Sequence, residues 1–277
     1  MKSIVYDGHV HSPYCPHGSS AAISEYIETL IHDGYEGVTF CEHAPLPERF
    51  VDPTPDSDSA MTLESLARYL DELQKLKKEY KSKLTINVGL EVDYIEGYEK
   101  ETEAFLDEYG RFLDDSILSV HFIHTSAGYF CIDYSAEVFQ MYANQFSSID
   151  EAVRHYYKTV QQSVTCHLGV FKPRRIGHPT LARKFQKNLP YPTDDQWIRD
   201  TLILIKNEGM QVDVNGAGVN KPGCQEPYPP LSFLKEKEAE GLHLVYGSDA
   251  HHPHGLSQGR EQLRGVRMYA PLDVNKT

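Results

Sequence analysis

Short apolar runs alternate with longer amphipathic stretches along the whole chain. The first such pair is a strand-like run at residues 3–7 and a helical stretch at residues 20–32. Apolar residues recur in the second stretch every three or four positions, which is typical of a helix with one buried face. Seven strand-like runs lie at residues 3–7, 37–41, 84–90, 116–120, 175–177, 210–214 and 242–247. The clearest helical stretches lie at residues 20–32, 63–80, 98–113 and 195–207.

This alternation predicts a parallel sheet whose strands are joined by helices. No low-complexity linker and no run of like charge divides the chain. Its 277 residues fit a β/α barrel, a fold that commonly needs about 250 residues in one domain. We therefore expect residues 1–277 to form a single α/β domain, a parallel β/α barrel.

Charge and composition exclude several classes of protein. The 27 basic residues against 40 acidic ones give a net charge of −13, which disfavours binding to nucleic acid or to an anionic membrane. No apolar run approaches the roughly 18–20 residues that span a bilayer, and the first residues do not form a signal-type apolar stretch. Five scattered cysteines without a C-x-x-C pair fit a reducing compartment. We expect a soluble cytoplasmic protein, and its oligomeric state stays open.

Each predicted strand ends in a side chain of a type that binds metal ions. The carboxyl ends of barrel strands converge on one site, whatever their separation in the sequence. Residues two positions apart in extended chain point to the same face, so His9 and His11 can share an ion, and Asp249 and His251 repeat this spacing. The candidate ligands at or near the strand ends are His9, His11, His17, His43, Glu91, His121, His178, Asp249 and His251.

The ligand types limit the choice of ion and of chemistry. Imidazoles with carboxylates, in the absence of converging thiolates, suit zinc, iron or manganese. Nine candidates are too many for one tetrahedral ion, so two or three divalent ions are expected. Multi-metal sites clamp phosphoryl oxygens and produce hydroxide near neutral pH, which makes hydrolysis of a small phosphate ester the first chemistry to infer. A non-catalytic metal-binding barrel is the alternative, and an assay for phosphatase activity distinguishes the two.

The order of these motifs resembles the PHP (polymerase and histidinol phosphatase) superfamily over nearly the whole chain. The motifs are H-x-H at 9–11 with a further histidine at 17, E-H at 42–43, G-L-E at 89–91, S-V-H at 119–121, I-G-H at 176–178 and G-S-D-A-H at 247–251. Within it, the chain is most similar to the monofunctional histidinol-phosphate phosphatases. The resemblance implies a distorted TIM-like (β/α)7 barrel with a trinuclear metal centre at the carboxyl ends of the strands. It also implies release of phosphate from L-histidinol phosphate in histidine biosynthesis, the alternative being another small phosphate ester or a nucleotide.

The resemblance further implies how the ligands are divided among the ions. Glu91 would bridge the first two ions, and a hydroxide between these ions would attack phosphorus in line. The first ion would be held by His9, His11, Glu91 and Asp249, the second by Glu91, His121 and His178, and the third by His17, His43 and His251.

Cations that follow the strand ends are candidates for contacts with the phosphate group. Arg183 follows the fifth predicted strand and could bind two phosphate oxygens with its guanidinium group, and Lys221 follows the sixth. The superfamily often has an acid and an arginine where this chain has Thr180 and Asn220, so the contacts to the substrate's amine and phosphate stay open. The predicted catalytic residues are Glu91, Asp249, His178 and Arg183, and the predicted substrate-binding residues are Arg183, Lys221, Asn215 and His43.

Overall fold

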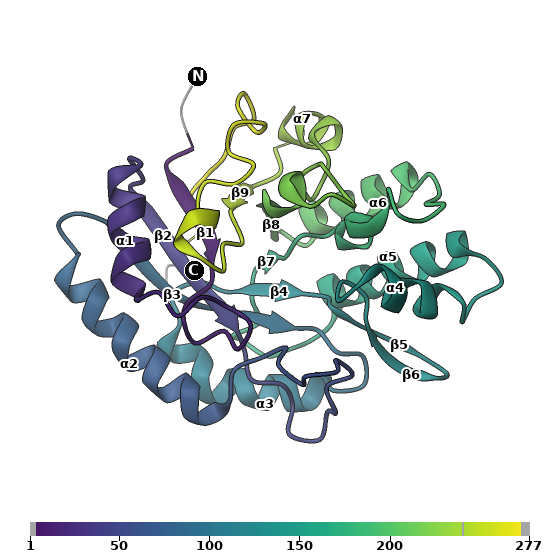
Figure 1. Ribbon diagram of the computed structural model, residues 1–277, viewed down its shortest axis with the longest axis horizontal. Coiled ribbons are helices and arrows are strands. Elements are labelled where there is room, and N and C mark those ends of the chain that lie inside the picture. The colour runs from purple at the N-terminus through teal and green to yellow at the C-terminus, as the bar shows by residue number, and fades with distance from the viewer. Residues whose placement is uncertain (1–3, 240, 273–277) are drawn as a thin grey trace.

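Seven parallel strands form the centre of the molecule (Figure 1). The computed structural model describes residues 4–239 and 241–272, so the start of the strand predicted at residues 3–7 lies outside the described residues. Hydrogen-bonded neighbours follow the order β1-β2-β3-β4-β7-β8-β9. The strands are β1 (Tyr6–Val10), β2 (Gly37–His43), β3 (Thr85–Asp93), β4 (Ile117–Ser119), β7 (Arg175–Ile176), β8 (Gln211–Asn215) and β9 (Leu244–Gly247).

The sheet curls until its last strand meets its first. Val10 forms a parallel bridge with Ala250, just after β9. The His11 amide donates to the Ala250 carbonyl at 3.0 Å, and the Asp249 amide donates to the His9 carbonyl at 2.7 Å. These bonds join the two edge strands at their carboxyl ends. The predicted seven-stranded α/β barrel is therefore confirmed, while the domain limits 1–277 stay a prediction.

Helices cover the outside of the sheet (Figure 1). In α1, Ile23, Tyr26, Ile27 and Leu30 are buried, the spacing expected of a helix that packs one face against strands. The four predicted helical stretches are confirmed, and the third ends in a short 3-10 turn, Gly110–Phe112. The helices are α1 (Ile23–His32), α2 (Leu63–Glu79), α3 (Glu99–Tyr109), α4 (Ala136–Ala143), α5 (Ile149–Thr165), α6 (Asp195–Asn207) and α7 (Leu231–Ala239).

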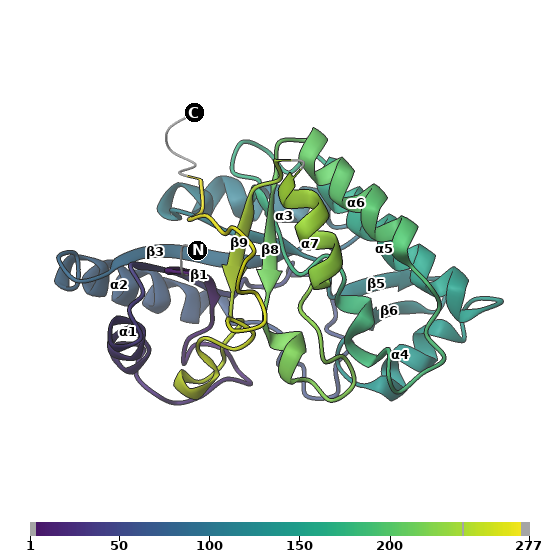
Figure 2. The same ribbon diagram turned by 90° about the horizontal axis from the view of Figure 1, so that it is seen from above.

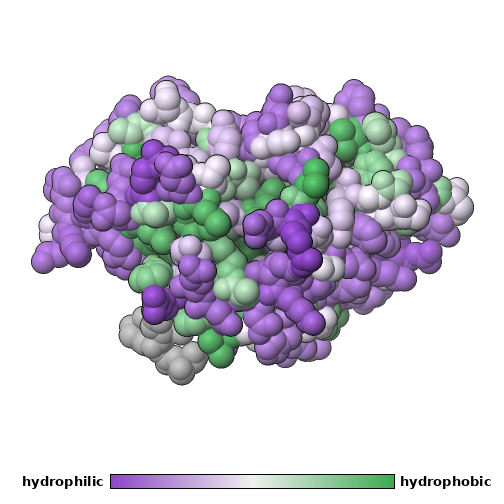
Figure 3. Space-filling view, turned by 90° about the horizontal axis from the view of Figure 1, so that it is seen from below, coloured by the Kyte–Doolittle hydropathy of each residue, from purple (hydrophilic) through white to green (hydrophobic). Residues whose placement is uncertain are grey.

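A helix that crosses a membrane must be long and apolar. Among the described residues, no helix combines the length and the apolar character that crossing a bilayer requires. Figure 3 shows one face of the molecule on which hydrophilic residues predominate and hydrophobic residues gather near the middle.

A long excursion between β4 and β7 was not predicted. An antiparallel hairpin of β5 (Phe122–Thr125) and β6 (Gly128–Cys131) begins directly after His121, and α4 and α5 follow it. The Ile132 amide donates to the His121 carbonyl at 3.0 Å, which returns the chain to the end of β4. The hairpin and α4 lie together on the side of the barrel away from α1 and α2 (Figures 1 and 2). This excursion supplies one wall of the cavity described below.

A charged group fills the barrel interior beneath the strand ends. Arg175 is fully buried, pairs with Asp115 and donates to the Gly8 carbonyl at 2.8 Å. A Cβ atom at Gly8 would lie 2.5 Å from the Arg175 guanidinium, so this position of β1 requires glycine. The barrel is thus polar inside, and its buried arginine serves neighbouring carboxylates and carbonyls.

Candidate metal centre

Side chains that can bind metal ions gather at the carboxyl ends of the strands. Four overlapping groups of histidine, cysteine and carboxylate side chains each place their possible ligand atoms within 4.8 Å of one another. His17 joins them, because its ring lies 5.3 Å from that of His43 and 5.1 Å from that of His251. The structure thus brings together all the predicted ligands: His9, His11, His17, His43, Glu91, His121, His178, Asp249 and His251.

The first group is centred on two imidazole nitrogens. The Nε2 atoms of His9 and His11 are 3.2 Å apart. Glu91 Oε2 lies 3.3 Å from the first and 3.5 Å from the second, and Asp249 Oδ1 lies 3.1 Å from His11 Nε2. Two nitrogens and two carboxylate oxygens therefore face a common point.

Carboxylates behind three of the imidazoles fix which ring nitrogen faces the neighbouring ligand atoms. A carboxylate only accepts hydrogen bonds, so each Nδ1 carries the proton that it donates, and each neutral ring turns the lone pair of its Nε2 toward the group. Nitrogen and carboxylate oxygen atoms that face one another need a proton or a metal cation between them, and this donor set suits zinc, iron or manganese. The three pairs are His9–Asp213, His11–Glu42 and His121–Asp93, with N–O distances of 3.1, 3.0 and 2.8 Å.

Glu91 links the first group to a second. Its other oxygen, Oε1, lies 2.9 Å from His178 Nε2 and 3.7 Å from His121 Nε2, and it accepts a hydrogen bond from Ser119 Oγ at 2.6 Å. On the first side, Glu91 Oε2 also lies 3.2 Å from His43 Nδ1. One carboxylate thus offers an oxygen to each of two neighbouring ligand groups.

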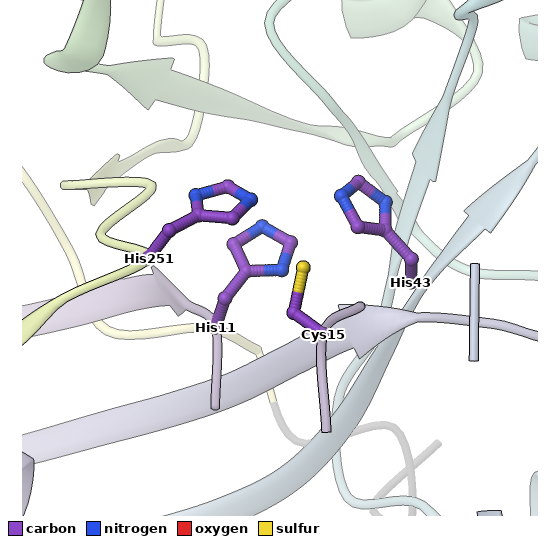
Figure 4. A group of neighbouring side chains, drawn as sticks. All are labelled: His11, Cys15, His43 and His251. Carbon is purple, nitrogen blue, oxygen red and sulfur yellow. The ribbon is translucent and has the colours of Figure 1, made fainter. Parts of the chain in front are cut away.

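A third group contains a thiol (Figure 4). The side chains of His11, Cys15, His43 and His251 point toward one another, with their ligand atoms within 4.8 Å. The expectation that no thiolate converges on the site is therefore wrong. It failed because Cys15 belongs to no cysteine pair and lies in a short loop, where spacing alone does not give the direction of a side chain.

The groups strongly perturb one another's protonation. Burial lowers the pKa of His9 and of His121, but the surrounding carboxylates outweigh burial and raise both to about 10. Burial raises the pKa of Glu91 and of Asp249, but the imidazoles outweigh it and hold both pKa values well below the usual range. For Cys15, hydrogen bonds to neighbouring imidazoles outweigh burial and lower the pKa to about 6. Without a metal ion, protons take the place of the cation.

Two of the candidate ligands have unusual backbone geometry. Asp249 has φ 55° and His178 has φ 22°, which side chains other than glycine rarely adopt. Such strain is retained at functional sites when the surroundings fix it. Here Asp7 Oδ1 accepts hydrogen bonds from the amides of Ser248 and His9 at 2.9 and 3.3 Å, which ties the end of β9 to β1.

A cavity of about 420 Å³ opens over the three groups. Lys184 and Lys221 line it together with Asp133, and Lys184 Nζ donates to Asp133 Oδ2 at 2.9 Å. A second cavity of about 280 Å³ shares His17, His43, His121, Asp133 and Lys184 with the first and adds Asp93, Phe122, Cys131 and Tyr134. The shared residues place the two cavities next to each other above the ligand groups.

The position of Arg183 corrects its predicted role. Its guanidinium pairs with Asp194 and donates to Glu226 Oε1 at 2.6 Å, and it does not line either cavity. Two carboxylates therefore already occupy the groups that were expected to bind phosphate. The next residue, Lys184, lies on the cavity side of the same 3-10 turn, Leu181–Phe185.

Of the other three predicted substrate contacts, two line the cavity and one does not. Lys221 and His43 line the cavity. Asn215 is fully buried and donates to Asp249 Oδ2 at 3.0 Å, while its own Oδ1 accepts from the Ala217 amide. Asn215 therefore positions Asp249 and does not face the cavity.

Comparison with known proteins identifies the family of this chain. A family model for the PHP domain matches residues 7–217. The chain belongs to the PHP family. It is 45% identical to the histidinol-phosphatase of Bacillus subtilis strain 168 over 249 residues, which cover 88% of this chain and 92% of that protein.

Two solved structures share this architecture. A Listeria monocytogenes protein assigned as a histidinol phosphatase superposes with a TM-score of 0.89 at 34% identity, covering 93% of this chain and 99% of that one. The Lactococcus lactis histidinol phosphate phosphatase was solved with zinc, L-histidinol and phosphate. It superposes with a TM-score of 0.67 at 18% identity, covering 99% of this chain and 98% of that one, which supports the shared fold.

The carboxylate behind His9 is expected to control metal affinity. Asp213→Asn removes the negative charge that fixes the His9 ring, and changes of this kind weaken metal binding about 10–100-fold. Isothermal titration of the metal-free protein with zinc measures the affinity. Asp71→Asn, which makes the same change on the exposed face of α2, is the control and should bind as the unmodified protein does. Equal affinity in the two variants would contradict this role of Asp213.

Metal binding should release protons. Because the pKa values of His9 and His121 lie near 10 without metal, both rings are protonated at neutral pH and must lose a proton before they bind an ion. The apparent affinity should therefore rise with pH up to about 10, roughly tenfold per pH unit for each proton released. Calorimetry in buffers of different ionisation enthalpy counts these protons, and a pH-independent affinity without proton release would refute the prediction.

Proposed function

We propose that this protein is a histidinol-phosphatase, a metal-dependent phosphomonoesterase that hydrolyses L-histidinol phosphate to L-histidinol and phosphate in histidine biosynthesis. The observation that carries the proposal is Glu91, buried between two groups of imidazole nitrogens at the base of a cavity that contains lysine. The 45% identity to the Bacillus subtilis histidinol-phosphatase supports the choice of substrate.

The donor atoms are sufficient for two to three divalent ions, which we propose to be zinc, iron or manganese. When bound, such ions lower the pKa of a water molecule and neutralise charge on phosphoryl oxygens. We propose that His9, His11, Asp249 and Glu91 hold the first ion, Glu91, His121 and His178 the second, and His17, His43 and His251 the third.

Within this site the protein's own residues fix geometry and charge. Glu91, Asp249 and His178 are the catalytic residues that we propose, because all three line the cavity and belong to the ligand groups. Lys184 carries a positive charge above them, and the Asp133 carboxylate holds its ammonium group in place. Burial lowers the pKa of Lys184, but Asp133 outweighs it and raises the pKa, so Lys184 stays charged and can bind a phosphoryl oxygen.

The adjoining cavity suits the organic part of the substrate. Phe122 and Tyr134 give it aromatic walls, while Asp93 and Asp133 supply acidic groups. Histidinol carries an amine and an imidazole, both of which can be cationic near neutral pH, and aromatic and acidic groups attract such cations. All five thiols are free in the structure, which fits the cytoplasmic location that we propose.

The experiment that tests the function is phosphate release from L-histidinol phosphate beside a panel of nucleotides and sugar phosphates. The metal content is determined on the same sample. The proposal expects kcat/KM for L-histidinol phosphate to exceed every other value in the panel by about a hundredfold or more. It also expects activity to disappear after chelation and return with zinc or manganese. A preference for a nucleotide would exclude the biosynthetic role, and bound metal without activity on any ester would exclude catalysis.

Lys184 is expected to contribute to phosphate binding. Lys184→Gln removes the charge above the metal ligands, and loss of a charge-assisted contact should lower kcat/KM about 10–100-fold. Inorganic phosphate should also become a weaker product inhibitor. Lys187→Gln removes an exposed lysine three positions further on and serves as the control. Equal kinetics of the two variants would show that Lys184 does not bind phosphate.

A further inference from the structure

Cys15 differs from the other cysteines in what its sulfur faces. Each of the other four thiols donates a hydrogen bond to an oxygen atom. The Cys15 side chain is only 4% exposed, and its sulfur lies with the ligand atoms of His11, His43 and His251 inside the 4.8 Å group (Figure 4). A buried thiol among imidazole nitrogens is an arrangement in which a metal ion binds.

The backbone holds Cys15 in this position. The Cys15 amide donates to the Ser12 carbonyl at 3.1 Å, and the Gly18 amide donates to the Cys15 carbonyl at 3.0 Å, so the loop makes two successive turns. A Cβ atom at Gly18 would lie 2.9 Å from Cys15 Cβ, which leaves room only for glycine. The Ser19 amide donates to the His251 carbonyl at 2.9 Å and so joins this loop to the segment that carries His251.

Two of the neighbouring histidines keep an Nε2 lone pair that can bind a metal ion. His17 Nδ1 lies 3.0 Å from the Asp58 carbonyl, and His251 Nδ1 lies 3.1 Å from the Asp249 carbonyl. A carbonyl only accepts, so each Nδ1 is the donor and each Nε2 is left with a lone pair. His43 is more than nine-tenths buried, and its Nδ1, which lies 3.2 Å from Glu91 Oε2, makes no hydrogen bond among the described residues.

We propose that the Cys15 thiolate is the fourth protein ligand of the third ion, completing a set with His17, His43 and His251. His11 stays with His9, since their Nε2 atoms are 3.2 Å apart. Ligand atoms of a tetrahedral zinc ion lie roughly 3.5 Å apart, and those of Cys15, His43 and His251 lie within 4.8 Å of one another. The His17 ring lies beside them, 5.3 Å from that of His43 and 5.1 Å from that of His251. The inference rests on the metal centre of the proposed function and not on the identity of the substrate.

This assignment has consequences for the choice of metal and for the role of the ion. A thiolate with imidazoles favours zinc or cobalt over manganese, whereas the two groups around Glu91 offer only nitrogen and oxygen. Four protein ligands close a tetrahedral site, as in structural zinc sites. The third ion would then fix the loop of Cys15 and His17 and supply positive charge beside the cavity.

Cobalt substitution tests the inference. The metal-free protein is titrated anaerobically with cobalt(II), and a thiolate ligand gives an intense near-ultraviolet charge-transfer band. The band is expected in the unmodified protein, and Cys15→Ser should lose both the band and one bound cobalt. Cys131→Ser is the matched control, because Cys131 is likewise a buried thiol but donates to Asp133, and it should keep both.

Two results would overturn the Cys15 assignment alone, and a third would overturn the metal centre as well. A band that survives in Cys15→Ser, or that is missing from unmodified protein holding two or three cobalt ions, overturns the Cys15 assignment while the metal centre stands. Failure of the unmodified protein to bind any metal overturns the metal centre, and the Cys15 assignment with it.

A measurement on the unmodified protein guards against a Cys15→Ser variant that does not fold. Iodoacetamide labelling, followed by mass spectrometry of peptides, is compared with and without zinc. Zinc should slow labelling of Cys15 about tenfold or more, because a metal-bound thiolate is a poor nucleophile. Cys166, which lies at the end of α5, should label at the same rate in both samples. Equal labelling of Cys15 with and without bound zinc contradicts the proposal.

Discussion

The buried carboxylate of Glu91 carries a negative charge that the surrounding structure must compensate. The group is 1% exposed, and an unpaired charge in such a place would cost several kcal/mol. Imidazoles on both sides compensate for it: His43 and His9 lie 3.2 and 3.3 Å from one oxygen, and His178 lies 2.9 Å from the other. Only a barrel, in which all strand ends point to one place, brings residues this far apart in sequence onto one carboxylate.

Further charged groups surround the imidazoles in successive layers. Behind the imidazoles lie further carboxylates, such as Asp213 behind His9, and beneath Asp213 lies the buried guanidinium of Arg175, 3.8 Å away. Acidic groups still dominate the immediate surroundings of the imidazoles, which is why the pKa values of His9 and His121 rise so far. The acidic groups favour the binding of cations at this centre. The whole chain carries a net charge of −13, so the positive charge that a phosphate ester needs must be local, from the proposed metal ions and from Lys184.

Sequence reasoning succeeded where local periodicity and chain topology decide the answer. All seven parallel strands were predicted, and the spacing of His9 and His11 correctly indicated that both rings face one place. Asp213 was missed because it lies within a predicted strand, and only residues at the strand ends were considered as candidates. Its position two residues before Asn215, on the same face of β8, was the available signal.

The remaining misses depend on turns and on an inserted segment. Arg183 and Lys184 are adjacent on a 3-10 turn, so a small rotation decides which one reaches the cavity, and only the tertiary contacts of Arg183 with Asp194 and Glu226 settle it. Asp133 follows the β5–β6 hairpin, whose place beside the barrel ends depends on packing between distant parts of the chain. Local patterns carry no information about such contacts.

In the proposed metal centre, Glu91 joins two metal ions at the base of the substrate cavity. Anomalous X-ray scattering from crystals of the metal-loaded protein, collected on both sides of the metal absorption edge, tests it directly. One peak is expected between Glu91 Oε2, His9, His11 and Asp249, and a second between Glu91 Oε1, His121 and His178. Peaks that leave either oxygen of Glu91 without a metal ion would contradict it.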